Sequence, residues 1–317
     1  MTDRRLLLRL ASVALVGAMA LTACGDDNET TDTGATGGPT DMGDITLAAF
    51  NFGESRILAN MYALVLEEAG YDATVKELTT REVVAPTLEE GKIDVVPEYI
   101  GTYTEYLNIQ VNGEGAKPLA TTNPDATLEA LQPLAESVGV TVLEPSEAQD
   151  QNSFAVTAAF AEENELETLS DLGALGGEYI LGGPPECPRR PFCQPGLEDT
   201  YGITISEFKP LDTGGPLTKA AIEDGTVDIG LVFSSDGGIE ALGLKVLADD
   251  KNLQTADNVV PVMNSDAYTE EAAAALNSIS EVLTTDDLIA LNNLVDIERQ
   301  QPDEVAETWL SKKGLIS

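Results

Sequence analysis

Carboxylates are the side chains of this sequence that could do acid–base chemistry, because its 317 residues include 55 Asp and Glu but no histidine. The lack of histidine removes the commonest general base and the commonest metal ligand, and it excludes Ser-His-Asp, Cys-His and His-based zinc chemistry. A carboxylate pair, for instance Glu54 with Glu98 or Asp94, would suit a carboxylate-dependent hydrolase. Such pairs arise by chance in an acidic chain, so we expect a protein without enzymatic activity, cofactor or metal.

Cys24 is the first of three cysteines, and it ends a segment with the features of a lipoprotein signal peptide (1–24). Three arginines precede an apolar stretch at 10–21, and Leu21-Thr22-Ala23 leads into the cysteine. Small residues there would let a peptidase reach the backbone, and the Cys24 thiol could then carry a lipid. We therefore expect a protein held at the outer face of the cytoplasmic membrane by Cys24.

Residues 25–43 consist almost wholly of Gly, Asp, Asn, Thr, Glu and Pro. This segment has too little apolar surface to fold, so we expect a disordered tether between the anchor and the folded body.

Cys187 and Cys193 lie six residues apart in a proline-rich stretch. An exported protein meets oxidising conditions, and two thiols without histidine are a poor metal site, so we expect a disulfide between them.

The formal net charge is −38, with 17 Lys and Arg against the 55 acids. Affinity for phosphate backbones comes from clustered basic residues, so nucleic acid is excluded as a partner. The remaining acids suit a solvated surface, and we expect a monomer.

Short apolar runs alternate with helical periodicity from residue 44 onward. Strands are expected at 45–50, 74–78, 93–96, 140–143, 152–157, 179–181, 207–211, 227–233, 244–247 and 259–263. Helices are expected at 55–69, 83–90, 127–138, 169–175, 197–201, 217–224, 270–283, 286–300 and 305–310. This alternation predicts an α/β protein with two parallel-rich sheets and helices on both faces.

Two such series followed by a returning segment suggest two lobes. We expect lobe 1 at 44–151 and 259–317 and lobe 2 at 152–258, joined by two strands that cross near 149–157 and 258–263. A ligand would bind in the cleft between the lobes, where the carboxyl ends of strands meet.

Several strings resemble the glycine betaine/choline/proline betaine substrate-binding proteins of ABC importers, which take quaternary ammonium osmoprotectants. These strings occur in the same order as in that family, at residues 51–64, 91–102, 185–190, 195–202, 211–214 and 227–236. The resemblance implies a two-lobed periplasmic-binding-protein fold of type II. It also implies delivery of the ligand to an ABC permease and its ATPase.

The resemblance also implies which residues hold the ligand. Tyr99 corresponds to a tyrosine of an aromatic cage, Thr102 to a hydroxyl donor and Arg190 to an arginine that binds a ligand carboxylate. Phe154 and Phe233 stand in place of cage tyrosines. Phe50 and Asn51, at the end of the first strand, complete the set. Aromatic faces attract a trimethylammonium group through cation–π interactions of about 0.5–2 kcal/mol each.

The chain departs from the family pattern in two places. Ala49 and Phe50 stand where many relatives have Ser-Lys, and 212–219 lacks a tyrosine that relatives carry after the same aspartate. A different small polar or zwitterionic solute is therefore an alternative ligand.

Overall fold

The computed structural model of the chain describes residues 42–317. The expected signal peptide, the lipidation candidate Cys24 and all but the last two residues of the expected tether (25–43) lie outside the described residues.

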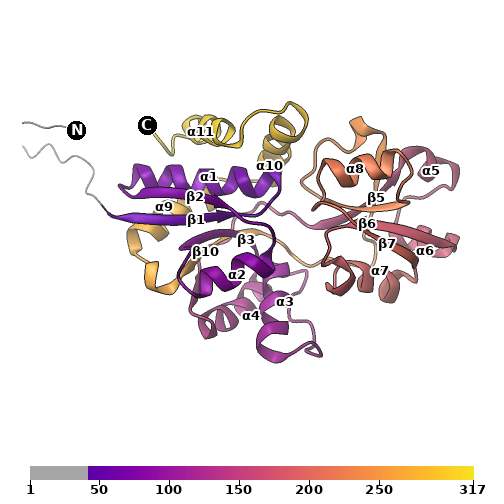
Figure 1. Cartoon of the computed structure of the whole chain (residues 1–317), viewed down its shortest axis with the longest axis horizontal. Coiled ribbons are helices and arrows are strands. Elements are labelled where there is room, and N and C mark those ends of the chain that lie inside the picture. Colours follow the sequence, from indigo (N-terminus) through magenta and orange to yellow (C-terminus); the bar gives the residue numbers. More distant parts are fainter. Residues whose placement is uncertain (1–41) are drawn as a thin grey trace, which may run out of the picture. The chain divides into compact units, whose positions relative to one another are not determined.

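Two five-stranded sheets form the framework of the described residues (Figure 1). The first sheet has the order β2-β1-β3-β10-β4, with bounds β1 Asp44–Ala49, β2 Asp72–Glu77, β3 Val95–Tyr99, β4 Val140–Val142 and β10 Val259–Asn264. The second sheet has the order β7-β6-β8-β5-β9, with bounds β5 Asn152–Thr157, β6 Glu178–Gly183, β7 Thr204–Pro210, β8 Ile229–Phe233 and β9 Leu244–Leu247.

Helices follow most of the strands. Those associated with the first sheet are α1 Gly53–Glu68, α2 Arg81–Glu89, α3 Ile100–Asn112, α4 Pro124–Ser137, α9 Glu270–Ser280, α10 Thr285–Asn292 and α11 Pro302–Lys313. Those associated with the second sheet are α5 Ala158–Glu163, α6 Leu169–Leu175, α7 Gln194–Tyr201 and α8 Pro216–Glu223. The predicted α/β class is confirmed.

Both sheets are mixed, where the sequence predicted mainly parallel ones. β1 pairs in parallel with β2 and β3, whereas β10 runs antiparallel to β3 and β4. In the second sheet β6 pairs in parallel with β7 and β8, whereas β5 runs antiparallel to β8 and β9. In each sheet the antiparallel pairings belong to the strand that has just crossed from the other sheet.

Strand residues alternate between two cores because successive side chains point to opposite faces of a sheet. In β1, Leu47 packs with α1 in one cluster and Ala48 faces the other. In β8, Leu231 packs in one cluster and Val232 in the cluster on the opposite face of the sheet. The central strands β8 and β10 are therefore buried on both faces and largely apolar, whereas the edge strands β2 and β7 carry polar, exposed residues.

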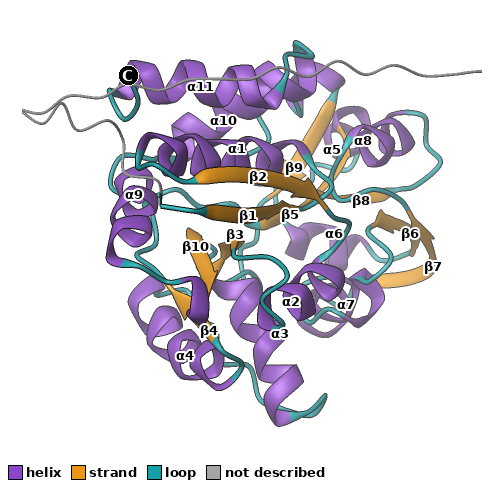
Figure 2. Ribbon diagram, turned by 60° about the vertical axis from the view of Figure 1, so that its left-hand side comes forward, coloured by secondary structure: helices purple, strands orange, loops and turns teal. Residues whose placement is uncertain are grey.

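α1 covers one face of the first sheet with buried residues at three-and-four spacing, among them Ile57, Leu58 and Met61. It packs on β1, β2 and α11, and Figure 2 shows it between the sheet and α11. Trp309 of α11 donates a hydrogen bond from Nε1 to the Asp287 carboxylate at 3.0 Å, so the C-terminal helices are fixed to one another.

The helix expected at 286–300 is shorter than predicted. α10 ends at Asn292, and residues Asn293–Ile297 form a π-helical turn. Asn293 and Ile297 on this turn pack against Gly237 and Gly238, where an added Cβ would collide with them. The turn thus brings the C-terminal region against the loop that follows β8.

Two segments connect the sheets within the described residues. The chain passes from β4 to β5 and returns from β9 to β10, and Gln149 and Asn258 on these segments pair as an antiparallel bridge. Cys187 and Cys193 form the expected disulfide, next to the start of α7.

The contact between α6 and α7 depends on Gly173, whose Cα lies against the Tyr201 carbonyl oxygen. We predict that Gly173→Ala lowers the free energy of unfolding by about 1–3 kcal/mol, because an added methyl group has no room there. Thermal unfolding would show this as a melting temperature lower by several degrees. Gly115→Ala is the matched control, since its Cβ meets nothing within 4 Å. Equal melting temperatures for the two variants would contradict the prediction.

Candidate functional site

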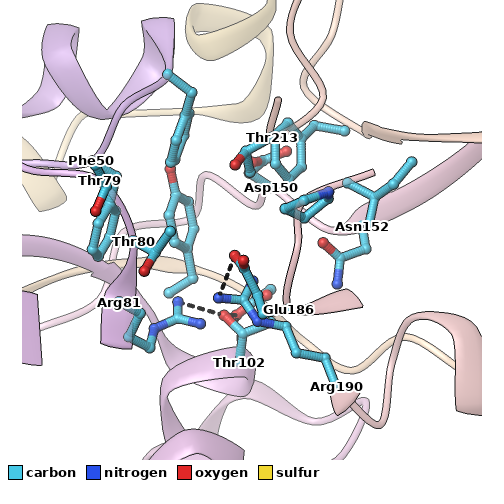
Figure 3. A pocket seen from close by; sticks show the side chains of 16 residues that line it. Phe50, Thr79, Thr80, Arg81, Thr102, Asp150, Asn152, Glu186, Arg190 and Thr213 are labelled. Carbon is cyan, nitrogen blue, oxygen red and sulfur yellow. Dashed lines mark hydrogen bonds and ion pairs between the residues drawn. The ribbon is translucent and has the colours of Figure 1, made fainter. Parts of the chain in front are cut away.

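A cavity with about 550 Å³ of empty space, part of it open to solvent, lies where the two sheets and the connecting segments meet. Its walls include residues that follow strands of the first sheet, residues of the second sheet and one residue from each connecting segment. They are Phe50, Phe52, Thr79, Thr80, Arg81, Tyr99, Thr102, Asp150, Asn152, Pro184, Glu186, Arg190, Thr213, Leu231, Phe233 and Asp257. Figure 3 shows Phe50, Thr79, Thr80 and Arg81 on one side and Asn152, Glu186 and Arg190 on the other.

Four aromatic rings lie along this cavity, and Phe52 is central among them. Its ring centroid is 6.1 Å from that of Phe50, 6.4 Å from that of Tyr99 and 5.6 Å from that of Phe233. The Phe50 and Tyr99 rings are stacked on Phe52, and the Phe233 ring is tilted. Together they make an aromatic wall to which both sheets contribute.

Strand ends position these rings. Phe50 follows β1, Tyr99 ends β3, Phe233 ends β8, and Phe52 is the residue before α1. The Phe50 backbone N–H donates to Ser55 Oγ at 2.8 Å, which fixes the turn between β1 and α1. This is the usual place for a ligand site in an α/β fold, at the carboxyl ends of the strands.

Arg81 forms the floor of the cavity with a buried ion pair. Its Nη2 donates to Glu98 Oε2 at 2.7 Å and to Thr102 Oγ1 at 2.9 Å, and its Nε donates to Glu98 Oε1 at 2.9 Å. The guanidinium carbon also lies 5.9 Å from the centroid of the Phe50 ring. Arg81 is thereby held rigidly, and its charge is neutralised by Glu98.

Arg190 connects the two sides of the cavity. Its Nη2 lies 3.2 Å from Glu82 Oε1, on α2, and 3.0 Å from Glu186 Oε1, on its own side. The guanidinium is partly exposed, so these pairs contribute little to stability and leave donors for another acceptor.

Asp257 lies on the segment that returns to the first sheet. Its Oδ1 accepts the backbone N–H groups of Gly101 at 2.8 Å and Thr102 at 3.0 Å, at the start of α3. Burial raises the pKa of this carboxyl to about 7, although the two N–H donors and the charge of Arg81 act to lower it.

The structure brings most of the predicted site residues to this cavity and leaves two outside its walls. Its walls include Phe50, Tyr99, Thr102, Arg190 and Phe233. Phe154 is 1% exposed and packs in the core of the second sheet. Asn51 is exposed, and its Oδ1 accepts a hydrogen bond from Arg56. The strand that carries Phe154 contributes Asn152 to the cavity instead.

Several wall residues were not predicted. Phe52 and Glu186 lie inside strings that resemble the family, so their positions were within reach of the sequence. Arg81, Asp150 and Asp257 carry no local motif, because their role depends on partners 17 or more residues away.

The carboxylates considered for hydrolysis have separate partners. Glu54 accepts a hydrogen bond from the Tyr99 hydroxyl, Glu98 is bound by Arg81, and Asp94 accepts the Thr46 backbone N–H at 2.7 Å. Each of these three carboxylates is thus held by a hydrogen bond or an ion pair.

Residues 43–312 match the family described as the substrate binding domain of ABC-type glycine betaine transport systems. The chain belongs to this family. The resemblance identified in the sequence strings is thus confirmed, together with the role of the chain as an ABC-transporter substrate-binding protein. Such proteins are extracytoplasmic, and theirs is not an enzyme class.

Individual relatives agree with this assignment. The glycine-betaine-binding protein of Pseudomonas aeruginosa is 28% identical over 84% of this chain and 86% of its own. The glycine betaine-binding protein YehZ of Escherichia coli is 27% identical over 82% of this chain and 88% of its own. A crystal structure of a glycine betaine/carnitine/choline ABC transporter protein has the same fold, with a TM-score of 0.66 and 24% identity over 86% of this chain and all of that one.

Within residues 42–317, none of the helices combines the length and the apolar content needed to cross a bilayer.

The pKa of Asp257 leads to a testable dependence of stability on pH. The folded-state value of about 7 lies above the ordinary 3.8, so unfolding releases a proton between these values. The group therefore lowers stability progressively as pH rises from about 4 to 7, by at most about 4 kcal/mol. We predict that Asp257→Asn, which keeps an oxygen for Gly101 and Thr102, gains stability relative to the unmodified protein between pH 5 and 8. Thermal unfolding at several pH values measures this, and a pH-independent difference would contradict it.

Proposed function

We propose that this protein binds a small quaternary ammonium solute, such as glycine betaine, choline or proline betaine, in the cavity and delivers it to the permease of an ABC importer. The relatives support this class of ligand, since two are named for glycine betaine and the structural neighbour for glycine betaine, carnitine and choline. The observation that carries the proposal is the aromatic wall formed by Phe50, Phe52, Tyr99 and Phe233.

A trimethylammonium group has no N–H to donate, so hydrogen bonds cannot select it. Aromatic faces attract it by about 0.5–2 kcal/mol each, and more strongly when water is excluded. Asp150 and Asp257 line the same cavity, and their carboxyl groups can supply negative charge to a bound cation. The site is therefore suited to a permanent, weakly hydrated cation.

Arg190 and Thr102 are the groups that we assign to the other end of the ligand. The Arg190 guanidinium is partly exposed at the cavity and can bind a carboxylate, while the Thr102 hydroxyl can bind a carboxylate or a hydroxyl group. A different small polar or zwitterionic solute would use the same groups, so it is the alternative ligand. We propose that the protein acts by binding alone, without catalysis.

Binding would be coupled to closure of two lobes, 44–151 with 259–317 and 152–258. The ion pair between Arg190 and Glu82 links a residue near the second sheet to α2 of the first, and such links favour the closed state. A ligand that touches both sides shifts the population further toward closure, and the closed form would dock on the permease and its ATPase.

We also propose that Cys24 carries the lipid that holds the protein outside the cytoplasmic membrane, with residues 25–43 as the tether. The sequence of the first 24 residues supports this assignment. A monomer would suffice, because the cavity is formed by one chain.

We predict micromolar binding of glycine betaine, choline or proline betaine, and a more than tenfold loss of affinity in Tyr99→Ala. Removal of the ring takes away one cation–π contact and opens the wall to water. Isothermal titration calorimetry measures both effects.

Two variants control for other causes. Tyr99→Phe keeps the ring but loses the hydroxyl that binds Glu54, so it should lose less affinity than Tyr99→Ala, and Tyr268→Ala removes an exposed tyrosine and should change nothing. No heat with any of the three ligands would refute the ligand class, and unchanged affinity in Tyr99→Ala would refute the aromatic wall.

We predict that Cys24→Ser abolishes incorporation of labelled fatty acid and moves the protein from the membrane fraction to the soluble fraction. The serine hydroxyl does not form the thioether to which the lipid is attached. A protein with both Cys187 and Cys193 replaced by serine is the control and should keep its label. Fatty-acid labelling that persists in Cys24→Ser would contradict the anchor.

A further inference from the structure

Beside the aromatic wall, two buried carboxyl groups belong to one hydrogen-bond network. Glu54, on the first turn of α1, and Asp150, on the segment between the sheets, are each 4% exposed. One hydrogen-bond network joins them: Ser235 Oγ donates to Asp150 Oδ1 at 2.8 Å, and the Asn292 amide donates to Ser235 Oγ at 3.2 Å and to Glu54 Oε2 at 2.6 Å. Asp150 also lines the cavity, so the pair adjoins the space that a ligand would occupy.

Neutral donors hold the pair in place. The Tyr99 hydroxyl donates to Glu54 Oε1 at 2.7 Å, and the Asn292 amide donates to Glu54 Oε2 at 2.6 Å. The Ser235 hydroxyl donates to Asp150 Oδ1 at 2.8 Å. Each of these donors is uncharged, so the hydrogen bonds orient the carboxyl groups without neutralising them.

The hydrogen bonds of the pair connect elements of both sheets. Asn292, on α10, also donates to the backbone oxygen of Ser235 at 3.2 Å, and Ser235 belongs to the loop after β8. Tyr99 is itself a ring of the aromatic wall. Glu54 and Asp150 are therefore connected to the first sheet, to the second sheet and to the cavity.

Within residues 42–317, the charged groups around the pair leave it without a cation of its own. On the return segment, Asp257 adds negative charge. At the end of β3, Glu98 is neutralised by Arg81, and on the Ser235 loop Asp236 is paired with Lys219, which also lies 4.0 Å from Asp296 of the π-helical turn. The nearby cations are thus already occupied by other carboxylates.

Two buried carboxylates in one hydrogen-bond network repel each other, so the pair retains one proton in the absence of a counter-ion. Burial raises the pKa of Glu54 and raises that of Asp150 well above its usual range, and the charge of Glu54 adds to the shift of Asp150. In the empty cavity the pair then carries one negative charge in place of two.

We propose that the Glu54–Asp150 pair is the counter-charge of the binding cavity, and that a quaternary ammonium ligand expels the proton that the pair retains when it binds. The inference rests on the proposed function and adds a specificity: the site favours a ligand with net positive charge, such as choline. A permanent cation beside Asp150 stabilises the doubly ionised pair, as any nearby opposite charge does.

Such coupling has a clear signature, because a quaternary ammonium has no proton to lose. Any proton that enters solution on binding comes from the protein. Linkage then requires that affinity rises with pH while the pair is protonated in the free protein, by up to about tenfold per pH unit for one proton.

The test is calorimetry of choline binding at pH 7 in phosphate and in Tris, whose ionisation enthalpies differ. We expect release of between about half a proton and one proton per choline, together with an affinity that increases from pH 6 to pH 8. Binding without proton release would overturn the inference and leave the proposed function standing. Absence of binding by choline, glycine betaine and proline betaine would overturn the proposed function and the coupling together.

Two variants identify the source of the proton. Glu54→Gln keeps acceptor and donor atoms for Tyr99 and Asn292 but removes the negative charge that helps to hold the proton on Asp150, so we expect the proton release per choline to fall. Asp257→Asn removes the other cavity carboxyl with a raised pKa and, whatever its effect on affinity, should retain the release. Loss of the proton in Asp257→Asn, with retention in Glu54→Gln, would assign it to Asp257 and refute the pair.

A measurement without ligand examines the pair independently. Side-chain carboxyl carbons followed by NMR in the free protein should show one protonated carboxyl of this pair at pH 7, and Asp150 should ionise at a lower pH in Glu54→Gln. Full ionisation of both groups at pH 7 would overturn the inference even if ligands bind.

Discussion

The guanidinium of Arg81 lies almost wholly out of solvent, and it can do so only because Glu98 binds it through two nitrogens. A buried charge without such a partner would cost several kcal/mol. The same requirement applies to Glu54, Asp150 and Asp257, which have hydrogen-bond donors but share the region with few cations. Buried charges in this cavity need partners, and its carboxyl groups outnumber the cations near them, so the uncompensated charge is negative. That imbalance is the physical basis for binding a cation.

The compensating groups come from elements far apart in the chain, so the same contacts that satisfy charges also hold the two sheets together. Arg190 reaches Glu82 across the cavity, and Asn292 joins Glu54 to Ser235. A ligand that changes the charge of the cavity therefore acts on contacts between the two sheets. In a substrate-binding protein this is the link between occupancy and the conformation that the transporter recognises.

The fold could be predicted from the sequence because the pattern of apolar residues is local. β5 and β9 were expected at the bounds that the structure shows, since each is a short run between polar segments. α3 was not expected, because it follows β3 without a turn and buries polar side chains such as Glu105 and Asn108. The Glu105 carboxylate accepts the backbone N–H of Ala120, a contact that no periodicity indicates.

The site could be predicted only where a sequence motif shared with the family placed a residue at the end of a strand. Tyr99 and Phe233 are of this kind, and both line the cavity. For Phe154 the sequence gives no means of separating a cavity wall from a core position, because both favour a buried aromatic residue in a strand. Asp150 is the opposite case, since an acidic residue in an acidic chain is unremarkable until its neighbours are known.

Arg190 shows how charge balance bears on the choice between a cation and a zwitterion. Two protein carboxylates, Glu82 and Glu186, already occupy this guanidinium, so a ligand carboxylate must compete with them. A ligand without a carboxylate leaves the two ion pairs intact and still meets the aromatic rings and the acidic pair. The cost of displacing Glu82 is small because it is partly exposed, whereas Glu186 is more deeply buried. We therefore expect a zwitterion to enter, but to gain less from this cavity than a ligand whose only charge is positive.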